Sequence, residues 1–351
     1  MNRVLFFLNS VRRALLPLQR ARLIPGSAKR SLLLPAVLCL CWLILAAGCG
    51  NSTGNRPAAE HAAYTVTDAT GTVLHLPGPP QRIVSTSIST DEILLALVPA
   101  SRVAAVTYLA DDPGISNVTE LAKPVAGRVR TVTPEALLAL NPDLIVAADY
   151  GKPEMIKTFR EMGIPLYIYH TAVNIREVED TVRALGTVVQ EREKAERLIQ
   201  SMEQRLQTVQ RQVGPLPESK RKRIAYYGSG GFYYMPKSSF QDICRKAGGI
   251  DVTEGLVYDK PGVLPQEVLV HLNPDVFMVP AWNYDGNHDP DMMARELLAN
   301  PAYKETKAVR DKAVVKIPAA HVLSLSQYIV DAVEDLARAL YPDRFGKGGT
   351  A

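Results

Sequence analysis

The stretch TPEALLALNPDLIV at residues 133–146 decides the fold, because a second copy of it follows as LPQEVLVHLNPDVFMV at residues 264–279. Each copy has a proline at the start of a short helical segment, then an Asn-Pro-Asp turn and an apolar run typical of a buried strand. The two glutamates near the helix starts, Glu135 and Glu267, stand 132 positions apart. A chain that repeats this unit predicts two similar lobes.

An aromatic residue closes each copy. Tyr150 and Trp282 each follow their glutamate by fifteen positions and stand just after the predicted strand. Open parallel sheets bind ligands at the carboxyl ends of their strands. We therefore expect both side chains at a cleft, where they can sandwich a flat or greasy ligand, although each can also pack against its own lobe. Tyr108 follows another predicted strand and is a ligand-binding candidate for the same reason.

The first 48 residues have the features of an export signal. They contain seven Lys and Arg and no Asp or Glu, followed by an apolar run from Ser31 to Leu45. The run is short for a membrane-spanning helix and contains Pro35, which favours removal over permanent anchoring. Small residues directly before Cys49 resemble a bacterial lipobox. We expect residues 1–48 to be a lipoprotein signal peptide and Cys49 to carry the lipid.

Removal of the leader changes the charge of the chain. The formal net charge of the full sequence is +4, but after residue 48 there remain 33 Lys and Arg against 36 Asp and Glu. Nucleic acid is therefore not an expected partner. Cys244 is the one cysteine that follows the lipidation site. No disulfide can form within one mature chain.

The rest of the sequence divides into a tether and two alternating blocks. Residues 49–63 are small and polar and predict a flexible tether. Residues 64–190 and 214–345 each alternate strand and helix patterns, which indicates parallel β-α units. Residues 191–213 between them carry a single apolar stripe with helical spacing. We predict an α/β fold with two Rossmann-like lobes, central mainly parallel sheets, and one long rigid α-helix as connector, without large hinge closure.

Taken together, these motifs resemble a known family. The mature chain is similar to class III, helical-backbone solute-binding proteins of ABC importers, the group that serves iron–siderophores, haem and vitamin B12. The resemblance covers residues 64 to 342, and no single motif in it is specific; their order and number carry it. The matching segments are Val66-Thr67-Asp68, residues 80–85, residues 90–94, both Asn-Pro-Asp signatures, and residues 329–334.

The resemblance implies a binding protein rather than an enzyme. Such a protein holds no intrinsic cofactor, captures a small metal chelate containing iron or cobalt, and delivers it to an ABC permease dimer with a cytoplasmic ATPase. By position, Glu135 and Glu267 are the residues that would dock into arginine pockets of the permease. A glutamate in the first turn of a helix also complements the helix dipole, but two copies favour docking. We expect a monomer outside the cytoplasm, held at the membrane by its lipid.

Further ligand-binding candidates carry charge. Arg128 and Arg130 precede the first docking helix, where arginine suits an anionic ferric siderophore or a propionate; as loop residues they can also be plain solvated charges. His170 and His321 each follow a strand and could reach a haem iron or a carboxylate. For a lone histidine the structural interpretation is favoured, and His321 is the one retained as a candidate.

A cluster of aromatic residues in the second block adds two candidates, Tyr227 and Tyr233, on either side of a glycine-rich turn at residues 228–231. We expect part of this cluster to line the cleft.

The sequence leaves the ligand open. A ferric siderophore is our first choice, with haem and corrinoids as alternatives. The residues before each docking glutamate lack the tryptophans that vitamin B12-binding relatives have there, which weakens cobalamin, although Tyr108 falls where such relatives place a tyrosine. A site for bare Zn²⁺ or Mn²⁺ is a remote alternative, because the histidines are scattered. A secreted hydrolase is another, because no nucleophile elbow or paired His-Glu zinc motif is present.

Overall fold

The computed structural model describes residues 62–151, 153–163, 165–228, 230–257, 261–283 and 289–346, without the side chain of Met155. The predicted signal peptide, the predicted lipidation site Cys49 and nearly all of the predicted tether lie outside these residues. Within the described ranges, no helix combines the length and the apolar character needed to cross a membrane.

A parallel sheet forms the centre of the part that we call the first lobe. Its strands lie in the order β5-β4-β3-β6-β7, and every hydrogen-bonded pair in it runs parallel. Successive side chains of a strand point to opposite faces of the sheet, and both faces are covered, so the strands are almost wholly apolar. The strands are β3 (Ile83–Ser85), β4 (Val103–Thr107), β5 (Gly127–Val129), β6 (Leu144–Ala148) and β7 (Leu166–Tyr169).

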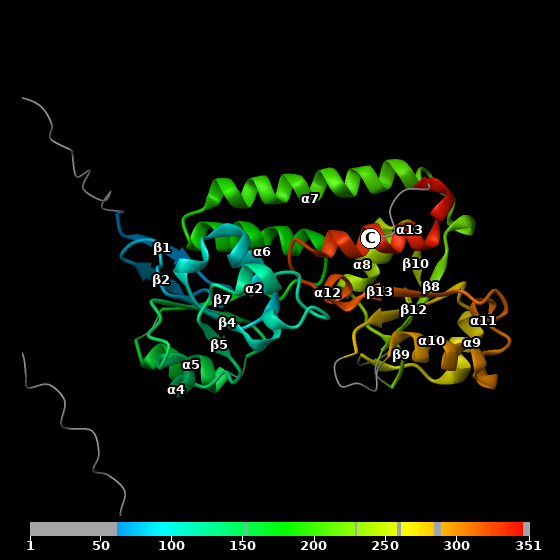
Figure 1. Ribbon diagram of the computed structural model, residues 1–351, viewed down its shortest axis with the longest axis horizontal. Helices are drawn as coiled ribbons and strands as arrows, with labels where there is room; N and C mark the ends of the chain where they lie inside the picture. Colours follow the sequence, from blue (N-terminus) through cyan, green and yellow to red (C-terminus); the bar gives the residue numbers. More distant parts are fainter. Residues whose placement is uncertain are drawn as a thin grey trace, which may run out of the picture. The chain divides into compact units, whose positions relative to one another are not determined.

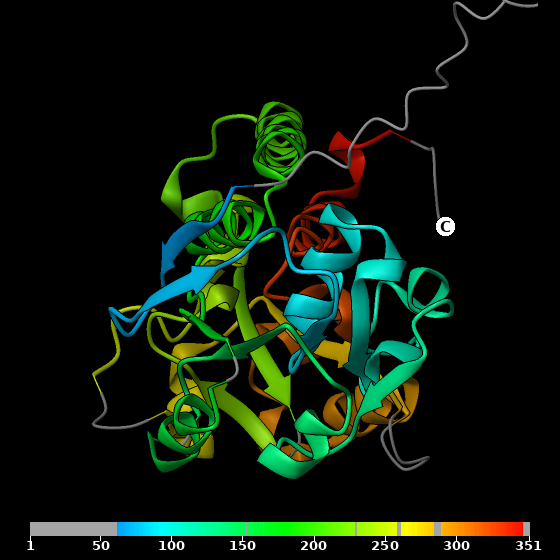
Figure 2. The same cartoon turned by 90° about the vertical axis from the view of Figure 1, so that its left-hand side faces the viewer.

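Helices cover both faces of this sheet. The face that includes Ile83 and Leu144 packs against α2 and α6 and the start of α7. The opposite face, which includes Val84 and Ile145, packs against α4 and α5. Figures 1 and 2 show this layering, with α6 and α7 on one side of the sheet and α4 and α5 on the other. The helices are α2 (Ile88–Leu97), α4 (Pro134–Leu138), α5 (Pro153–Glu161), α6 (Ile175–Val188) and α7 (Arg192–Val213).

The second lobe has a mixed sheet in the order β11-β9-β8-β12-β13, with β10 also paired to β8. The pairs of β8 with β10 and β12, and of β12 with β13, are parallel. The pairs of β9 with β8 and β11 are antiparallel. The strands are β8 (Arg223–Gly228), β9 (Gly231–Tyr234), β10 (Ile250–Asp251), β11 (Gly262–Val263), β12 (Val276–Ala281) and β13 (Val314–Pro318).

The second sheet is also enclosed by helices. One face shares a hydrophobic core with α7, α8 and α13, and the other packs against α9, α10 and α11. The helices are α8 (Ser239–Lys246), α9 (Gln266–Leu272), α10 (Pro290–Ala299), α11 (Lys307–Arg310) and α13 (Ile329–Leu340). The observed architecture confirms the predicted α/β class, with two mainly parallel sheets and a long connecting helix.

The duplicated signature folds in the same way in both lobes. Asn141 and Asn273 adopt positive φ values of 50° and 44°, a conformation that asparagine tolerates better than most residues. Asn273 is the C-cap of α9, and Asn141 follows the C-cap Ala139 of α4 by two residues. Asp143 then accepts the backbone N–H of Arg82, and Asp275 accepts that of Arg223, at 2.8 Å in each case. These bonds fix the start of β3 beside β6 and of β8 beside β12. The sequence repeat is therefore a structural repeat.

Helix α7 contributes to two hydrophobic cores with a single stripe. Ala195 and Ile199 belong to the core of the first lobe, whereas Met202, Val209 and Val213 belong to that of the second. Helix α6 is shared in the same way. Its first turns, with Ile175 and Val178, join the second core, and its later residues, from Val182 on, join the first.

The remaining elements are short. β1 (Tyr64–Thr67) and β2 (Val73–Leu76) form an antiparallel hairpin that packs on the first lobe, and its register pairs Val66 with Leu74. The other short segments are α3 (Thr119–Ala122), α12 (Ala319–Val322), and 3₁₀ turns at Ala100–Arg102, Tyr108–Asp111, Glu218–Lys220, Pro301–Tyr303 and Pro342–Arg344.

Candidate functional site

A cavity of about 310 Å³ lies at the carboxyl ends of the first-lobe strands. Segments that follow β3, β4, β5, β6 and β7 all reach it, because the carboxyl ends of parallel strands meet at one edge of the sheet. Leu325, from the segment between α12 and α13, closes it from the second lobe. The lining residues are Thr86, Ser87, Ile88, Ser89, Thr107, Tyr108, Leu109, Val129, Arg130, Val132, Tyr150, Tyr169, Thr171 and Leu325.

Tyr108, Tyr150 and Arg130, all predicted from the sequence, meet at this cavity. Tyr150 is 73% exposed and Tyr108 is 45% exposed, unusual values for large aromatic side chains. The Arg130 guanidinium lies over the Tyr108 ring, with Cζ 5.4 Å from the ring centre. Within the described part of the chain, Arg130 has no carboxylate in an ion pair. The site thus offers an exposed cation over one aromatic ring, with a second exposed tyrosine in the same cavity.

Hydroxyl groups form the floor of the cavity. Ser87 Oγ lies 2.9 Å from Tyr169 Oη and 2.9 Å from Thr90 Oγ1, and Thr90 Oγ1 lies 2.6 Å from Ser85 Oγ. Burial raises the pKa of Tyr169 far above its usual value, so its phenol stays neutral. The floor is therefore a fixed, uncharged hydrogen-bond network.

The buried side chain of Asp91 stabilises the end of β4 beside this hydroxyl network. Asp91 on α2 is 0% exposed and accepts the Thr107 backbone N–H at 3.0 Å and the Thr107 hydroxyl at 2.5 Å. Burial raises the pKa of Asp91 to about 7, against the hydrogen bonds from Ser85 and Thr107, which lower it. Asp91 does not itself line the cavity, but it holds the end of β4 in place.

Trp282, also predicted as a ligand contact, lies where the two lobes touch. Its Nε1–H donates a hydrogen bond to Asp112 Oδ2 of the first lobe at 3.0 Å. A Cβ atom at Gly114 would lie 2.2 Å from Trp282 Cδ1, so glycine is what permits the close approach of the ring. Trp282 thus joins the lobes next to the Tyr108–Asp111 turn that contributes to the cavity wall.

The other predicted ligand-binding residues have partners elsewhere. Arg128 binds both carboxylate oxygens of Asp111 at 2.8 Å, and His321 Nδ1 lies 2.6 Å from Asp335 Oδ2 on α13. Burial lowers the pKa of His321, but the bond to Asp335 outweighs this and the pKa lies above its ordinary value. Neither residue lines the cavity. His170 is likewise held, with Nδ1 2.7 Å from Asp149 Oδ2.

Tyr227 and Tyr233 belong to the second lobe's own aromatic packing. The Tyr227 ring meets Phe232 edge-on with ring centres 5.0 Å apart, and Tyr233 meets Tyr226 edge-on at 6.4 Å. Neither tyrosine lines the cavity.

Several cavity residues were not predicted from the sequence. Ser87, Tyr169, Thr171 and Leu325 all line it. The rule that selected Tyr150, namely an aromatic residue at a strand's carboxyl end, applies equally to Tyr169 at the end of β7. Leu325 has no such signal, because only the packing of the two lobes brings it there.

The predicted docking glutamates lie on corresponding helices of the two lobes. Glu135 is in the first turn of α4 and Glu267 in that of α9, and both side chains are exposed. Neither carboxylate has a hydrogen-bonded partner within the described residues. Figure 1 shows α4 and α9 on the side of the molecule opposite α7, one on each lobe. Such a pair can meet two sites on one partner surface.

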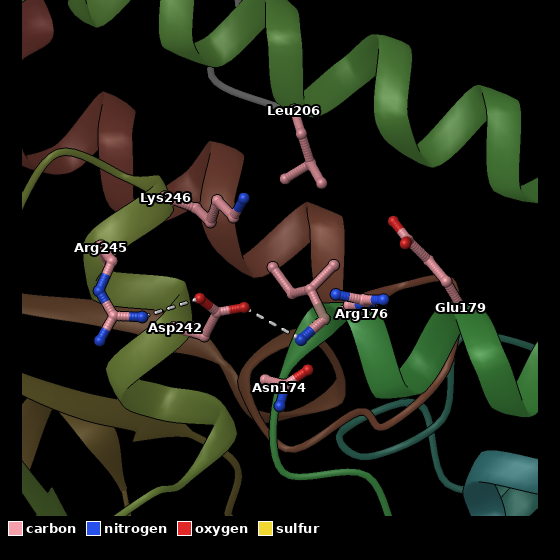
Figure 3. A pocket seen from close by; sticks show the side chains of 8 residues that line it. Asn174, Arg176, Glu179, Leu206, Asp242, Arg245 and Lys246 are labelled. Atoms are coloured by element: carbon pink, nitrogen blue, oxygen red, sulfur yellow. Dashed lines mark hydrogen bonds and ion pairs between the residues drawn. The ribbon is translucent and has the colours of Figure 1, made fainter.

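A second cavity, of about 350 Å³, lies beneath α7 between α6 and α8 (Figure 3). Asp242 Oδ2 accepts the backbone N–H of Ile175 at 3.0 Å, and its Oδ1 lies 3.2 Å from Arg245 Nη1. This carboxylate caps the start of α6 and ties it to α8. The charged lining residues are Arg176, Glu179, Asp242, Arg245 and Lys246, of both signs. It has no aromatic wall, and the first cavity is the better ligand site.

A bare metal ion finds no site in the described part of the chain. Within those residues, no three His, Cys, Asp or Glu side chains converge closely enough to hold one. The first cavity is instead suited to a preformed molecule with an anionic group and a flat or apolar surface.

Comparison with known proteins identifies the family to which the chain is similar. The family model described as periplasmic binding protein matches residues 83–320. The chain is 25% identical over 317 residues to YvrC of Bacillus subtilis, an uncharacterized ABC transporter substrate-binding lipoprotein, covering 86% of this chain and 95% of that protein. It is 25% identical over 303 residues to a cobalamin-binding protein of Halobacterium salinarum, covering 82% of this chain and 78% of that protein.

Solved structures show the same fold. A periplasmic binding protein from Veillonella parvula superimposes with a TM-score of 0.67 at 20% sequence identity, covering 80% of this chain and 98% of that one. At this identity the likeness concerns the fold alone.

Proposed function

The chain belongs to the periplasmic binding protein family of ABC importer substrate-binding proteins, and we propose that it captures an anionic metal chelate, with a ferric siderophore as first choice. The observation that carries this proposal is Arg130, a cation without an ion-pair partner among the described residues, which lies over the exposed Tyr108 ring at a cavity that the exposed Tyr150 also lines. The relatives are transport proteins, so no chemistry on the ligand is proposed.

Arg130 supports an anionic ligand. Its neighbour Arg128 binds both carboxylate oxygens of Asp111, so Asp111 forms its ion pair with Arg128 and interacts with Arg130 only at longer range. An exposed guanidinium can bind a carboxylate, hydroxamate or catecholate oxygen with two parallel hydrogen bonds. The cation also keeps the Tyr108 ring in place, so that both groups are positioned before the ligand arrives.

The tyrosines support a ligand with a broad face. Tyr108 and Tyr150 leave large apolar surfaces open to water, and covering them gains about 25 cal/mol for each Å². The neutral hydroxyl floor can in addition exchange hydrogen bonds with polar groups of the ligand. The binding energy would therefore come from aromatic contact, with Arg130 and the floor fixing orientation.

We further propose that Glu135 and Glu267 dock on the permease, that Cys49 anchors the protein outside the cytoplasm by a lipid, and that one chain acts alone. Support for docking comes from the matching places of the two glutamates on α4 and α9. Support for lipidation comes from the small residues before Cys49 and from the relative named as a lipoprotein.

Cobalamin or a related corrinoid is the second candidate ligand, because a relative that matches most of the chain is named for cobalamin binding. A corrinoid also has a broad face that Tyr108 and Tyr150 could cover. The two candidates differ in how much they need Arg130, since a ferric siderophore is more strongly anionic.

The first experiment uses Trp282, the single tryptophan after residue 48. Its emission reports on the contact between the lobes next to the cavity. Residues 50 to 351 would be titrated with ferric siderophores, haem and cobalamin, with correction for ligand absorbance. We expect saturable quenching by ferric siderophores. Saturation by cobalamin alone would select the second candidate, and no saturation by any chelate in emission or calorimetry would refute the proposal.

A further inference from the structure

A buried acidic residue stands where the lobes meet below the cavity. Glu92 on α2 of the first lobe is 0% exposed. The segment between α12 and α13 of the second lobe passes over it, with Ser324, Ser326 and Gln327 also buried. Leu325, in the middle of this segment, is the second-lobe residue that lines the cavity.

One carboxyl oxygen of Glu92 holds a loop of its own lobe. Oε1 accepts the backbone N–H of Asn117 at 3.0 Å and its side-chain amide at 2.8 Å. The same Asn117 amide donates to the Ala320 carbonyl of α12 at 2.6 Å. Gln327 Nε2 donates to the Glu92 carbonyl at 3.1 Å, which adds a second tie to α2.

The other carboxyl oxygen of Glu92 forms a triangle of hydrogen bonds with the hydroxyl groups of two serines. Glu92 Oε2 lies 2.9 Å from Ser324 Oγ and 2.5 Å from Ser326 Oγ, and the two serine oxygens lie 2.7 Å apart. Three hydrogen bonds among three oxygens need three hydrogens, and the two serines supply only two. A protonated carboxyl supplies the third, and each oxygen then donates once around the ring. The backbone N–H groups of Ser326 and Tyr328 donate into the ring at 3.2 Å, so they compete with no hydroxyl hydrogen.

The surroundings of Glu92 favour the neutral form. The titratable groups that face it are Asp91 on its own helix, His321 on α12 and Tyr328 at the start of α13. His321 is paired with Asp335, and Asp331 farther along α13 is paired with Arg205. Burial raises the pKa of Glu92 against the hydrogen bonds from Ser326, Asn117 and Ser324. Among the described residues, no cation forms an ion pair with it.

We propose that Glu92 is a positioning residue whose protonated carboxyl clamps Ser324 and Ser326 of the second lobe to α2, and thereby holds Leu325 at the cavity. When the carboxyl releases its proton to solvent, the triangle loses one hydrogen bond and a buried charge is left without an ion-pair partner. The segment from Ser324 to Tyr328 then loosens, and chelate affinity falls. The effect on affinity rests on the proposed function, but the clamp itself does not.

The sign of the pH dependence follows from the direction of the pKa. Because the folded protein holds this proton more tightly than the unfolded chain, the clamp is complete at low pH and is lost as pH rises through the raised pKa. The measurements should therefore extend from acidic pH, below the ordinary pKa of a glutamic acid, to basic pH well above it.

The test compares wild type with Glu92→Gln and Glu92→Ala, first without ligand. Amide hydrogen exchange of Ser326 and Tyr328, corrected for the intrinsic rate, reports on the clamp directly. Wild type should lose protection by about tenfold as pH rises, the factor that corresponds to one net hydrogen bond. Glu92→Gln supplies a permanent N–H donor and should stay protected at every pH, whereas Glu92→Ala should stay unprotected. Glu120→Gln, an exposed carboxylate on α3, is the control and should match wild type.

The second step measures the affinity for ferric siderophores over the same range. Affinity of wild type should fall with rising pH while that of Glu92→Gln stays constant. A pH dependence of protection that is equal in wild type and Glu92→Gln, or absent from wild type, would overturn the clamp. If no chelate binds at any pH, the proposed function fails, and the exchange measurement still decides the role of Glu92.

Discussion

Arg130 is the residue from which most of the proposed specificity arises. It is exposed, lies over Tyr108, and has no carboxylate partner in an ion pair within the described ranges. Arg128, two positions earlier, has the same side chain, but its guanidinium donates hydrogen bonds to Asp111 and to three backbone carbonyls. The two arginines therefore differ in their surroundings. Arg128 is held by neighbouring residues of its loop, and Arg130 lines the cavity.

Replacing Arg130 should affect ligands in proportion to their charge. We expect Arg130→Ala to weaken ferric siderophore binding by about tenfold or more, because a charge-assisted hydrogen bond is lost, and to weaken cobalamin binding less. Arg130→Lys should recover part of the affinity, since it keeps the charge but not the fork. Calorimetry at two salt concentrations measures both. Arg197→Ala, an exposed arginine on α7, is the control; equal losses in the two arginine variants would contradict the assignment.

Asp91 should make stability depend on pH. Its pKa is raised from 3.8 to about 7 in the folded protein, so the folded state binds this proton more tightly than the unfolded state. The contribution to stability is complete below pH 3.8 and is lost as pH rises through about 7. Asp91→Asn, which cannot ionise, should lack this loss.

Urea unfolding across that range tests the expectation. The difference in unfolding free energy between Asp91→Asn and wild type should grow with pH, by an amount on the order of a few kcal/mol. If the unfolding free energies of the two proteins instead changed with pH in parallel, Asp91 would be ionised well below neutral pH.

At the scale of elements, the loop of residues 112–117 joins the lobes. Asp112 accepts the Trp282 indole N–H, Gly114 lies under the same ring, and Asn117 bridges Glu92 and Ala320. The loop follows directly on Tyr108 and Leu109 of the cavity wall. Only a few residues of chain therefore separate the lobe contact at Trp282 from that wall.

Gly114→Ala should separate Trp282 from this loop. The new Cβ would lie 2.2 Å from the ring, so the ring must move away and its bond to Asp112 must break. We expect a red shift of tryptophan emission and a loss of about 1–3 kcal/mol in unfolding free energy, as for other overpacked sites. Gly262→Ala is the matched control, because nothing lies within 4 Å of its new Cβ. Unchanged emission in Gly114→Ala would place the ring elsewhere in solution.

Elements were more predictable from the sequence than contacts between them. The signature helices, β6, β12 and α7 are set by local patterns, namely proline at a helix start, Asn-Pro-Asp turns and an apolar stripe, and all are present. Tyr108 and Tyr150 were predicted because each closely follows a strand, and strand ends share one edge of a sheet, whereas Arg130 was predicted because it precedes the first docking helix. Leu325 and Glu92 could not be found in this way. The serine partners of Glu92 lie 232 and 234 positions away in the chain. Leu325 lies at least 154 positions from the other cavity residues, and these groups meet only after the lobes have packed.

The sequence also could not predict which partner a side chain contacts when both a ligand and a neighbouring residue are available to it. Arg128, Tyr227, Tyr233 and His321 have residue types that suit a ligand site. Arg128 was selected for its place before a docking helix, the two tyrosines for their place around a glycine-rich turn, and His321 for its place after a strand. Whether such a side chain faces a ligand or a neighbour depends on Asp111, Phe232, Tyr226 and Asp335, and no local pattern encodes those pairings. Their part in ligand binding stays a prediction.

For the whole molecule, docking on the permease should be separable from binding of the chelate. Glu135 and Glu267 lie on helices away from the cavity lining. We expect Glu135→Ala with Glu267→Ala to leave chelate affinity unchanged and to abolish uptake by cells that carry the permease, because carboxylates on rigid helix starts are lost from both lobes. Glu120→Ala with Glu161→Ala, which removes two exposed carboxylates of α3 and α5, is the control. Normal uptake by the first double variant would remove both glutamates from the docking surface.

The apolar residues of α6 and of α7 contribute to the cores of both lobes, and this determines how far the two copies of the repeat depend on each other. Each helix buries one end in the first core and the other in the second. A chain cut anywhere along this pair would leave apolar surface on both pieces and deprive each core of part of its wall. The two halves, although built on the same signature, are therefore not independent folding units, and we expect neither half to be stable when it is expressed without the other.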